Sequence, residues 1–379
     1  MRAGDFSGSF NEMNGKRERV LVAMSGGVDS SAAAIILKKN GFEPIGVTMK
    51  LFEPDRDNGN YVPKGCCSTE SIYDARYVCS KIGIPHYTLD LSSEFKAKVI
   101  NNFVDEYLAG RTPNPCIKCN TYLKWGALIE FADKMGINFI ATGHYARITA
   151  LNGGKEFVLL KAKHTSKDQS YALWGIKREL LARTLFPLGE LSKTETRRLL
   201  EEEGVSFFDK GESQEICFIP DNDLESYLRE QAFRRGEDIR KGAILSEKAE
   251  LMGEHKGLPF YTIGQRKGLG ISHPKPLYVK GMDKKRNVLI VAENKSLLSK
   301  SCLVEGINWL IDEPPTGEDI AFEVKIRYRH KPSMAKCRIL DKGLVGVVFD
   351  LPQRAITPGQ SAVFYNGDRL CGGGIIIAP

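Results

Sequence analysis

One short glycine-rich segment constrains how the N-terminal half can fold. Ser25-Gly26-Gly27-Val28-Asp29-Ser30-Ser31 follows a wholly apolar stretch at 20–24 and precedes a helical pattern over 30–40 that stops at Gly41. Glycines let a backbone approach a phosphate group closely, and the N-terminus of the following helix favours an anion. No Gly-Lys-Ser/Thr of a Walker A sequence follows the glycines. The segment therefore predicts a strand, a phosphate loop of another type, and a helix.

Strand and helix patterns alternate through the first half of the chain. Apolar stretches at 45–49, 86–90 and 137–142 predict strands, and apolar residues recur between them at helical spacing. This alternation predicts an α/β domain over residues 19–210, built on a doubly wound parallel sheet whose ligands bind beyond the carboxyl ends of its strands. Residues 1–18 are polar and lack an apolar targeting segment, so we expect a disordered tail.

The second half changes character twice. Residues 211–285 are glycine-rich and basic, with short elements such as a helix over 224–231, and indicate a small central domain. Over 286–379, apolar β-branched stretches recur between turn signals and predict a C-terminal β-barrel. These stretches are 288–291, 320–328, 336–340, 344–349, 361–365 and 374–377.

Composition and charge narrow the class of protein. Hydrophobic residues make up 42% and charged residues 27% of the chain, and no apolar stretch approaches the roughly 18 residues of a membrane span. We therefore expect a cytoplasmic protein without membrane contact. The formal charge of +7 is concentrated in residues 256–286, with eight Lys/Arg and one acid, and in 325–338, with six and none. Such stretches favour a polyanion, in the first place nucleic acid, although short basic stretches also occur as solvated faces.

Nine cysteines, an odd number, favour thiol chemistry or metal binding over a disulfide framework. Cys116 and Cys119 lie at an expected loop-to-helix junction with Asn120 as N-cap, where the helix N-terminus and Lys118 favour the thiolate. Cys217 lies in a charged loop. The spacing of Cys116 and Cys119 is that of zinc ligands, although structural zinc needs four ligands and no second pair is evident, and three cysteines without a fourth also suit an iron–sulfur cluster with one open iron, so both metals remain open. Cys79, Cys302, Cys337 and Cys371 are expected to be buried and inert, and the adjacent pair Cys66 and Cys67 receives no role.

With these motifs in place, the chain from about residue 19 to its end resembles the tRNA-specific 2-thiouridylases of the MnmA/TrmU family, within the ATP pyrophosphatase superfamily whose loop reads SGGxDS. The resemblance implies an adenine nucleotide α-hydrolase-like fold and an ATP-dependent tRNA-uridine 2-sulfurtransferase that uses Mg²⁺. The C2 oxygen of the wobble uridine, position 34, would be adenylated and then displaced by a cysteine persulfide sulfur from a donor protein, releasing AMP and pyrophosphate. Further matching segments are Ala141-Thr142-Gly143-His144-Tyr145-Ala146-Arg147, Lys167-Asp168-Gln169-Ser170, Phe186-Pro187-Leu188-Gly189, Tyr261-Thr262-Ile263-Gly264-Gln265-Arg266 and Lys325-Ile326-Arg327-Tyr328-Arg329.

The same resemblance implies roles residue by residue. Cys217 would carry the persulfide, and Cys119 would help to release the sulfur by closing a transient disulfide with Cys217. The nucleotide would be held by Ala23, Met24, Ser25, Gly26, Gly27, Val28, Asp29, Ser30, Met49 and Gly143. The tRNA would contact Asn114, Pro115, Cys116, His144, Lys167, Asp168, Gln169, Arg327, Tyr328 and Gln360.

Cys116 departs from the family pattern, because many members carry Asp at that position. A thiol does not act as acid or base in the same way, so the proton transfers stay open. The change also leaves open a cluster held by Cys116, Cys119 and Cys217. Two further readings are an amidotransferase synthetase of the same superfamily, for which no N-terminal glutaminase nucleophile is present, and a non-catalytic tRNA-binding protein that keeps a nucleotide loop.

Overall fold

The computed structural model describes residues 17–52, 69–205 and 216–379, and these form two compact units. The first unit contains the described residues up to Lys98, together with Cys116–Asn222 and Asp368–Leu370. The second contains Val99–Pro115, Asp223–Gly367 and Cys371–Pro379. The pair Cys66 and Cys67 and the expected tail up to residue 16 lie outside the described residues. None of the helices in the described ranges is long and apolar enough to cross a membrane.

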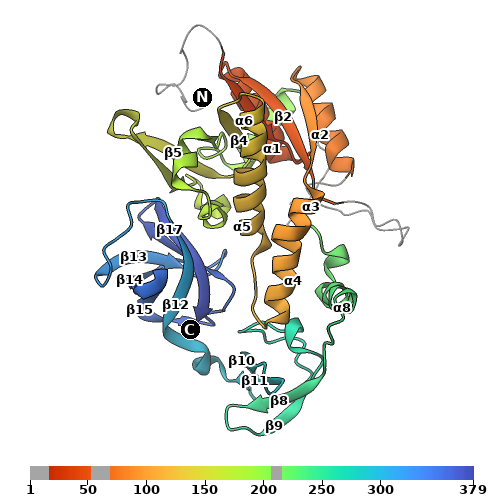
Figure 1. Ribbon diagram of the computed structural model, residues 1–379, viewed down its shortest axis with the longest axis vertical. Helices are drawn as coiled ribbons and strands as arrows, with labels where there is room; N and C mark the ends of the chain where they lie inside the picture. Colours follow the sequence, from red (N-terminus) through yellow and green to blue (C-terminus); the bar gives the residue numbers. More distant parts are fainter. Residues whose placement is uncertain (1–16, 53–68, 206–215) are drawn as a thin grey trace. The chain divides into compact units, whose positions relative to one another are not determined.

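A five-stranded parallel sheet forms the centre of the first unit (Figure 1), in the order β3-β2-β1-β4-β7. Val20 and Val22 of β1 pack into one core with α1 and α2, while Leu21, which points to the other face, is also fully buried. Both faces of the sheet are therefore covered, and the predicted doubly wound class is confirmed. The elements are β1 Arg19–Ala23, α1 Val28–Lys39, β2 Glu43–Lys50, α2 Thr69–Lys81, β3 His86–Asp90, β4 Phe139–Thr142 and β7 Thr184–Leu185.

The chain between β3 and β4 is almost continuously helical. It comprises α3 Ser92–Phe95, a π-helical turn Lys96–Ile100, α4 Asn101–Leu108, α5 Pro115–Cys119, a π-helical stretch Asn120–Ala127 and α6 Leu128–Lys134. A hairpin of β5 Ala146–Leu151 and β6 Glu156–Lys161 follows β4, and α7 Lys193–Glu202 follows β7. The strand order reverses at β1 and β4, which is where ligands bind in folds of this class.

The second unit contains a small four-stranded sheet in the order β10-β11-β8-β9. Its elements are α8 Leu224–Arg234, β8 Gly242–Ser246, β9 Leu251–His255, β10 Tyr278–Asp283 and β11 Val288–Ala292. The sequence reading placed 288–291 in the C-terminal barrel, starting at residue 286. Instead β11 pairs with β10 as a hairpin and with β8 in parallel. An apolar strand carries no local mark of which sheet it joins, and the tight turn from β10 decides it here.

Six antiparallel strands form a closed barrel in the same unit, as predicted. The order is β12-β15-β14-β13-β16-β17, and β17 pairs with β12 to close it. Trp309 stacks on Phe364 inside the barrel with ring centroids 5.4 Å apart. The first strand was not predicted, because its exposed and buried residues do not alternate regularly. The strands are β12 Leu298–Trp309, β13 Asp319–Lys325, β14 Ser333–Ile339, β15 Val345–Arg354, β16 Ser361–Asn366 and β17 Arg369–Ala378.

Gly143, directly after β4, packs its backbone against the start of α1. A Cβ at this position would lie 2.6 Å from the carbonyl carbon of Asp29 and from the amide nitrogen of Ser30. Because backbone atoms cannot move aside cheaply, we expect Gly143→Ala to destabilise the first unit by about 1–3 kcal/mol. Thermal unfolding measures the effect, with Gly281→Ala, where no atom lies within 4 Å, as the control. Equal melting temperatures for the two variants would contradict this packing.

A capping box starts α7. The Ser192 Oγ accepts from the Glu195 amide at 3.3 Å, and the Glu195 carboxylate accepts from the Ser192 amide at 2.8 Å. We expect Ser192→Ala to cost about 1 kcal/mol. The backbone and hydroxyl of Ser192 lower the pKa of Glu195, so this carboxylate stabilises the fold near neutral pH and loses that contribution as the pH falls through the lowered pKa. The difference in melting temperature between wild type and Ser192→Ala should therefore stay constant from about pH 7 to about pH 5 and narrow as the pH falls further to about 3; a difference that is the same at all these pH values would contradict the role of Glu195.

Candidate active site

The glycine loop joins β1 to α1 at the reversal of strand order. Gly26 has a φ of +67°, and a Cβ there would lie 2.3 Å from the carbonyl oxygen of Ser71, so the position requires glycine. Gly27 is the N-cap of α1 in extended conformation, and no side chain caps the helix. The first amides of α1 therefore lack a side-chain acceptor, and an anion can take that place.

Serine hydroxyls set the shape of this loop. The Ser25 amide donates to Ser30 Oγ at 3.1 Å, and Ser30 Oγ donates to the Gly27 carbonyl oxygen at 3.2 Å. Ser31 Oγ donates to the same carbonyl at 2.9 Å. Because these bonds lie within the loop, its conformation is in place before any ligand binds.

An ion pair joins the glycine loop to the start of α7. Lys193 Nζ, at the first residue of α7, lies 2.7 Å from Asp29 Oδ1, and Tyr145 Oη donates to the same oxygen at 2.9 Å. The Lys193 side chain is only 16% exposed and that of Asp29 35%. A partly buried ammonium suits a phosphate, and a carboxylate suits a divalent cation.

Sequence reasoning missed Lys193. A signal was present, because Ser192-x-x-Glu195 is a capping-box pattern that marks a helix start four residues after the matching segment that ends at Gly189. A lysine at the first position of a helix that follows a short strand lies near the carboxyl edge of the sheet. The ion pair with Asp29 itself joins residues 164 positions apart and needed the structure.

The sheet brings the remaining predicted nucleotide residues to one edge. Ala23 ends β1, Met49 lies at the penultimate position of β2, and Gly143 directly follows β4. Since β1 lies between β2 and β4, these residues occupy the carboxyl ends of three neighbouring parallel strands. The predicted set is therefore gathered in one place, and its role in nucleotide binding stays a prediction.

Gln169 and Asp168, two predicted tRNA contacts, take part in the scaffold of this edge. Gln169 Oε1 accepts from the Tyr145 amide at 2.9 Å, and the Gln169 amide donates to the Tyr145 carbonyl at the same distance. The buried Asp168 carboxylate accepts from the Ala162 amide at 3.0 Å and from Ser170 Oγ at 2.9 Å. Gln169 thus aligns the tyrosine that holds Asp29, and Asp168 holds the turn. The preceding Lys167 is partly exposed.

His144 lies between an ammonium group and aromatic rings. Its Nδ1 is 2.7 Å from Thr142 Oγ1, its Nε2 is 3.4 Å from Lys124 Nζ, and the Trp125 ring centroid is 5.8 Å away. Burial, and secondly the Lys124 charge, hold the pKa of His144 well below its usual range. The ring is therefore neutral at pH 7, so a contact with RNA would be a hydrogen bond rather than a charge interaction.

The expected helix start near Cys119 is wrong. Helix α5 begins at Pro115, so Cys116 is its second residue and Cys119 its last, and the helical path continues through Asn120. Asn120 is buried and, instead of capping the helix, donates to the Ala172 carbonyl at 2.9 Å and accepts from Lys124 at 2.8 Å. Proline is well suited to the first turn of a helix, and the helix therefore begins at the proline rather than after the asparagine. Cys116 is exposed and Cys119 partly exposed.

The other cysteines divide as expected. Burial raises the pKa of Cys79 and of Cys302 to about 12, so these thiols are inert. Cys337 and Cys371 are buried as well, which confirms the expectation for all four. Cys217 is partly exposed, and the next residue, Phe218, is buried with its ring 5.7 Å from that of Phe95.

A protein-bound metal ion needs several ligand side chains close together, and no such cluster occurs among the described residues. Within residues 17–52, 69–205 and 216–379, no three or more His, Cys, Asp or Glu side chains gather in a way that could hold a metal ion. Cys116, Cys119 and Cys217 fall inside these ranges. The described arrangement of these three cysteines does not fit an iron–sulfur cluster.

The predicted tRNA contacts in the second unit are Gln360, Arg327 and Tyr328, and each has different interactions within the protein. Gln360 Nε2 donates to the Thr112 carbonyl at 2.8 Å, and the Thr112 amide donates to the Pro358 carbonyl at 2.9 Å. Gln360 therefore secures the segment that leads to Asn114 and Pro115, of which Pro115 is buried. The Arg327 guanidinium donates to the Arg354 carbonyl at 2.7 Å. Tyr328 is 42% exposed, and the Lys325 ammonium lies 5.7 Å from its ring centroid.

Part of the charge counted in the two basic stretches is neutralised by acids from outside them. Lys275 pairs with Glu293 at 2.9 Å, and Arg338 pairs with Asp319 at 2.6 Å. Lys256 and Lys280 likewise pair with Glu225 and Glu247. The positive potential is therefore more local than the sequence count indicates.

Three family models match the chain. They are described as a tRNA methyl transferase HUP domain over residues 18–221, a tRNA methyl transferase PRC-barrel domain over 234–293, and an aminomethyltransferase beta-barrel domain over 299–376. The second match ends just after β11, in agreement with the place of this strand in the small central sheet.

Curated relatives match nearly the whole chain. The tRNA-specific 2-thiouridylase MnmA of Carboxydothermus hydrogenoformans is 44% identical over 361 residues, which are 95% of this chain and 98% of that protein. MnmA 1 of Caldanaerobacter subterraneus subsp. tengcongensis is 46% identical over 358 residues, 94% and 97% of the two chains. Among solved structures, a 4-thiouridine synthetase–RNA complex with bound ATP covers 50% of this chain and 41% of its own at 16% identity and a TM-score of 0.35, a likeness too low to support an inference. On these matches, and with a phosphate loop at the reversal of strand order, the chain belongs to the tRNA-specific 2-thiouridylase MnmA family.

Proposed function

We propose that this protein thiolates tRNA, replacing the C2 oxygen of the uridine at position 34 with sulfur at the expense of ATP. The observation that carries the proposal is the uncapped start of α1 behind Gly26 and Gly27, faced by the Asp29–Lys193 ion pair. This arrangement suits a nucleoside triphosphate, and the curated relatives are named as tRNA 2-thiouridylases. A carbonyl oxygen is a poor leaving group, so its adenylation explains why a thiolating enzyme needs such a site.

The nucleotide half of the reaction uses the carboxyl edge of the sheet. The amides of Gly27 and Val28 bind phosphate oxygens, and Lys193 neutralises the charge that develops on the pyrophosphate leaving group. Asp29 is the ligand offered to Mg²⁺, which when bound screens the phosphate charges. Ala23, Met49 and Gly143 line the same edge and complete the nucleotide site.

The sulfur half of the reaction uses Cys217 and Cys119. A donor protein transfers a sulfur atom to Cys217, giving a persulfide whose terminal sulfur attacks C2 of the activated uridine. The C2–O bond breaks and AMP leaves with the electron pair. The Cys119 thiolate then attacks the Cys217 sulfur, so that the thiocarbonyl is released and a Cys119–Cys217 disulfide remains. A cellular dithiol supplies the two electrons that reduce this disulfide for the next turnover.

Recognition of the tRNA uses some of the predicted contact residues directly and others indirectly. Exposed Tyr328, neutral His144 and partly exposed Lys167 are the contacts to expect from the predicted set, whereas Asp168, Gln169 and Gln360 act by holding the segments beside them. Cys116, exposed on the first turn of α5, faces the target base in this proposal. The reaction takes place in the cytoplasm, where thiols stay reduced.

The principal experiment incubates unmodified tRNA with the protein, ATP, Mg²⁺ and a sulfur source, and analyses the digested nucleosides by mass spectrometry. We expect 2-thiouridine at position 34, and one AMP and one pyrophosphate for each sulfur inserted. Omission of ATP should abolish the product. Normal tRNA binding with no thiolation under any of these conditions would favour a non-catalytic binding protein.

Replacing the sulfur carrier separates the persulfide route from its alternatives. We expect Cys217→Ser to lose at least about 100-fold in thiolation with unchanged tRNA affinity, because a hydroxyl cannot carry sulfane sulfur. Cys79→Ala, which removes a buried thiol of raised pKa, should retain activity. Unchanged 2-thiouridine in the Cys217→Ser reaction would refute the mechanism. Iron and labile sulfide in active, anaerobically purified protein would instead favour a cluster on Cys116, Cys119 and Cys217.

Lys193 provides a test of the nucleotide half alone. We expect Lys193→Met to weaken ATP binding by about 10–100-fold and AMP binding much less, because its ammonium faces the phosphates beyond the α position and a charged hydrogen bond contributes about 1.5–3 kcal/mol. Isothermal titration calorimetry without tRNA measures both affinities, with Lys134→Met on the exposed end of α6 as the control for lost charge. Equal losses for ATP and AMP would show that Lys193 only supports the loop.

A further inference from the structure

A loop of the second unit, between Gln265 and Val279, is built around a fixed base. The Gly264 amide donates to the Val279 carbonyl at 2.7 Å, and the Val279 amide donates to the Gln265 carbonyl at 2.9 Å. Leu269 is buried, and Ile271 and Leu277 pack on the same apolar cluster. The apolar residues therefore set the course of the loop, and the polar residues between them are exposed.

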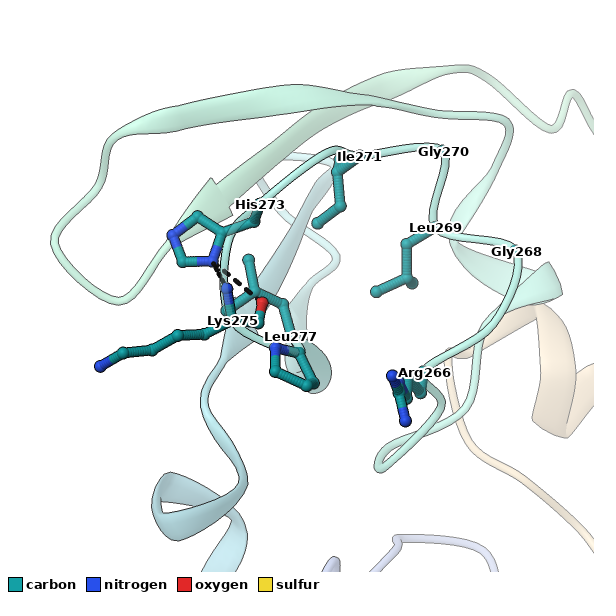
Figure 2. Close-up of a pocket in the computed structure, with 9 residues that line it drawn as sticks. Arg266, Gly268, Leu269, Gly270, Ile271, His273, Lys275 and Leu277 are labelled. Atoms are coloured by element: carbon teal, nitrogen blue, oxygen red, sulfur yellow. Dashed lines mark hydrogen bonds between the residues drawn. The ribbon is translucent and has the colours of Figure 1, made fainter.

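This loop surrounds a cavity of about 220 Å³ (Figure 2) lined by Arg266, His273 and Lys275 together with small and apolar residues. Gly268 and Gly270, with φ of +76° and +66°, let the chain turn around it. His273 Nδ1 lies 3.2 Å from the Lys275 amide nitrogen and 3.0 Å from the Lys275 carbonyl oxygen. The imidazole is thereby oriented through Nδ1, and its Nε2 takes no part in that contact.

The charge of the loop has one sign. Residues 264–280 contain four Lys/Arg and no Asp or Glu. Glu293 pairs with Lys275, and Glu247 pairs with Lys280. No acid in the described part of the chain lies within ion-pair distance of Arg266 or Lys267, and both are exposed. The uncompensated charge therefore lies at the edge of the cavity.

The size and lining of the cavity select the class of ligand. Pockets for small organic ligands usually measure about 300–1,000 Å³ and are mostly apolar. A smaller cavity with arginine, histidine and lysine on its walls suits a single phosphate group. A neighbouring cavity of about 300 Å³ shares Lys275 and Pro276 and adds Tyr278, Lys295 and Glu293, the acid that pairs with Lys275. Because Glu293 neutralises Lys275, the free positive charge beside the first cavity comes from Arg266 and Lys267, and exposed cations of this kind attract the phosphates of a nucleic-acid backbone.

We propose that the Arg266–Lys275 loop binds a backbone phosphate of the tRNA substrate. The inference rests on the proposed function, because it names a surface on which the RNA lies. Arg266 and Lys267 supply the charge, His273 supplies a hydrogen bond through Nε2, and the apolar anchors keep these groups in place before binding. Free inorganic phosphate has the same chemistry, and the experiment separates the two sources.

The test measures tRNA affinity by fluorescence anisotropy, without ATP or a sulfur source, over a series of salt concentrations. For Arg266→Ala and Lys267→Ala we expect affinity about 3–10-fold weaker than wild type, and a log affinity against log salt slope shallower by about one unit. Lys134→Ala, an exposed change of equal charge in the first unit, should alter neither quantity. Unchanged melting temperatures of the variants establish that they fold.

Three outcomes decide against the proposal, and they are distinguishable. If wild type binds tRNA and both variants bind it with the same affinity and slope, the loop is not an RNA contact and the proposed function stands. If inorganic phosphate, followed by ³¹P NMR, binds wild type but not Arg266→Ala while tRNA affinity is unchanged, the site takes a free anion. If wild type itself does not bind tRNA, the proposed function fails with it.

Discussion

The ion pair between Asp29 and Lys193 is the contact on which the proposed nucleotide site depends. It joins the first turn of α1 to the first residue of α7 at 2.7 Å, and Tyr145, fixed in turn by Gln169, donates to the same carboxylate oxygen. A cation and an anion are thus held beside an uncapped helix start before any ligand arrives. Groups that are already oriented cost no reorganisation when charge develops, which is how a protein stabilises a leaving group efficiently.

The described cysteines form two groups that differ in the exposure of their thiols. Cys79, Cys302, Cys337 and Cys371 are buried, and burial alone disfavours their thiolates. The three remaining described cysteines, which the resemblance assigns to the reaction, all keep some exposure. They belong to the first unit together with the phosphate loop, so the proposed activation and sulfur transfer would use residues of one compact unit, while the basic loop at Arg266 belongs to the other.

Local signals succeeded where neighbours in sequence decide the structure. The phosphate loop needed only a strand, two glycines and a helix in succession, and Gly26 has the positive φ that this implies. Local signals failed where a residue or strand that is distant in the sequence decides the structure. Asn120 is of a residue type that often caps helices, but its side chain donates to the Ala172 carbonyl. The apolar sequence of β11 resembles that of a barrel strand, but β11 pairs with β8 and β10. Lys193 was missed for the same reason, because its partner lies 164 residues away.

By itself, the sequence determined the fold class, the nucleotide loop and the buried character of four cysteines, because alternation, glycine and apolar context act over a few residues. Only the tertiary structure decided which charges remain uncompensated. Acids distant in sequence neutralise Lys256, Lys275, Lys280 and Arg338, whereas Arg266 and Lys267 lie on a loop of the second unit with no acid of the described residues beside them. Coulomb interactions depend on distance in space, and a linear sequence does not contain that distance.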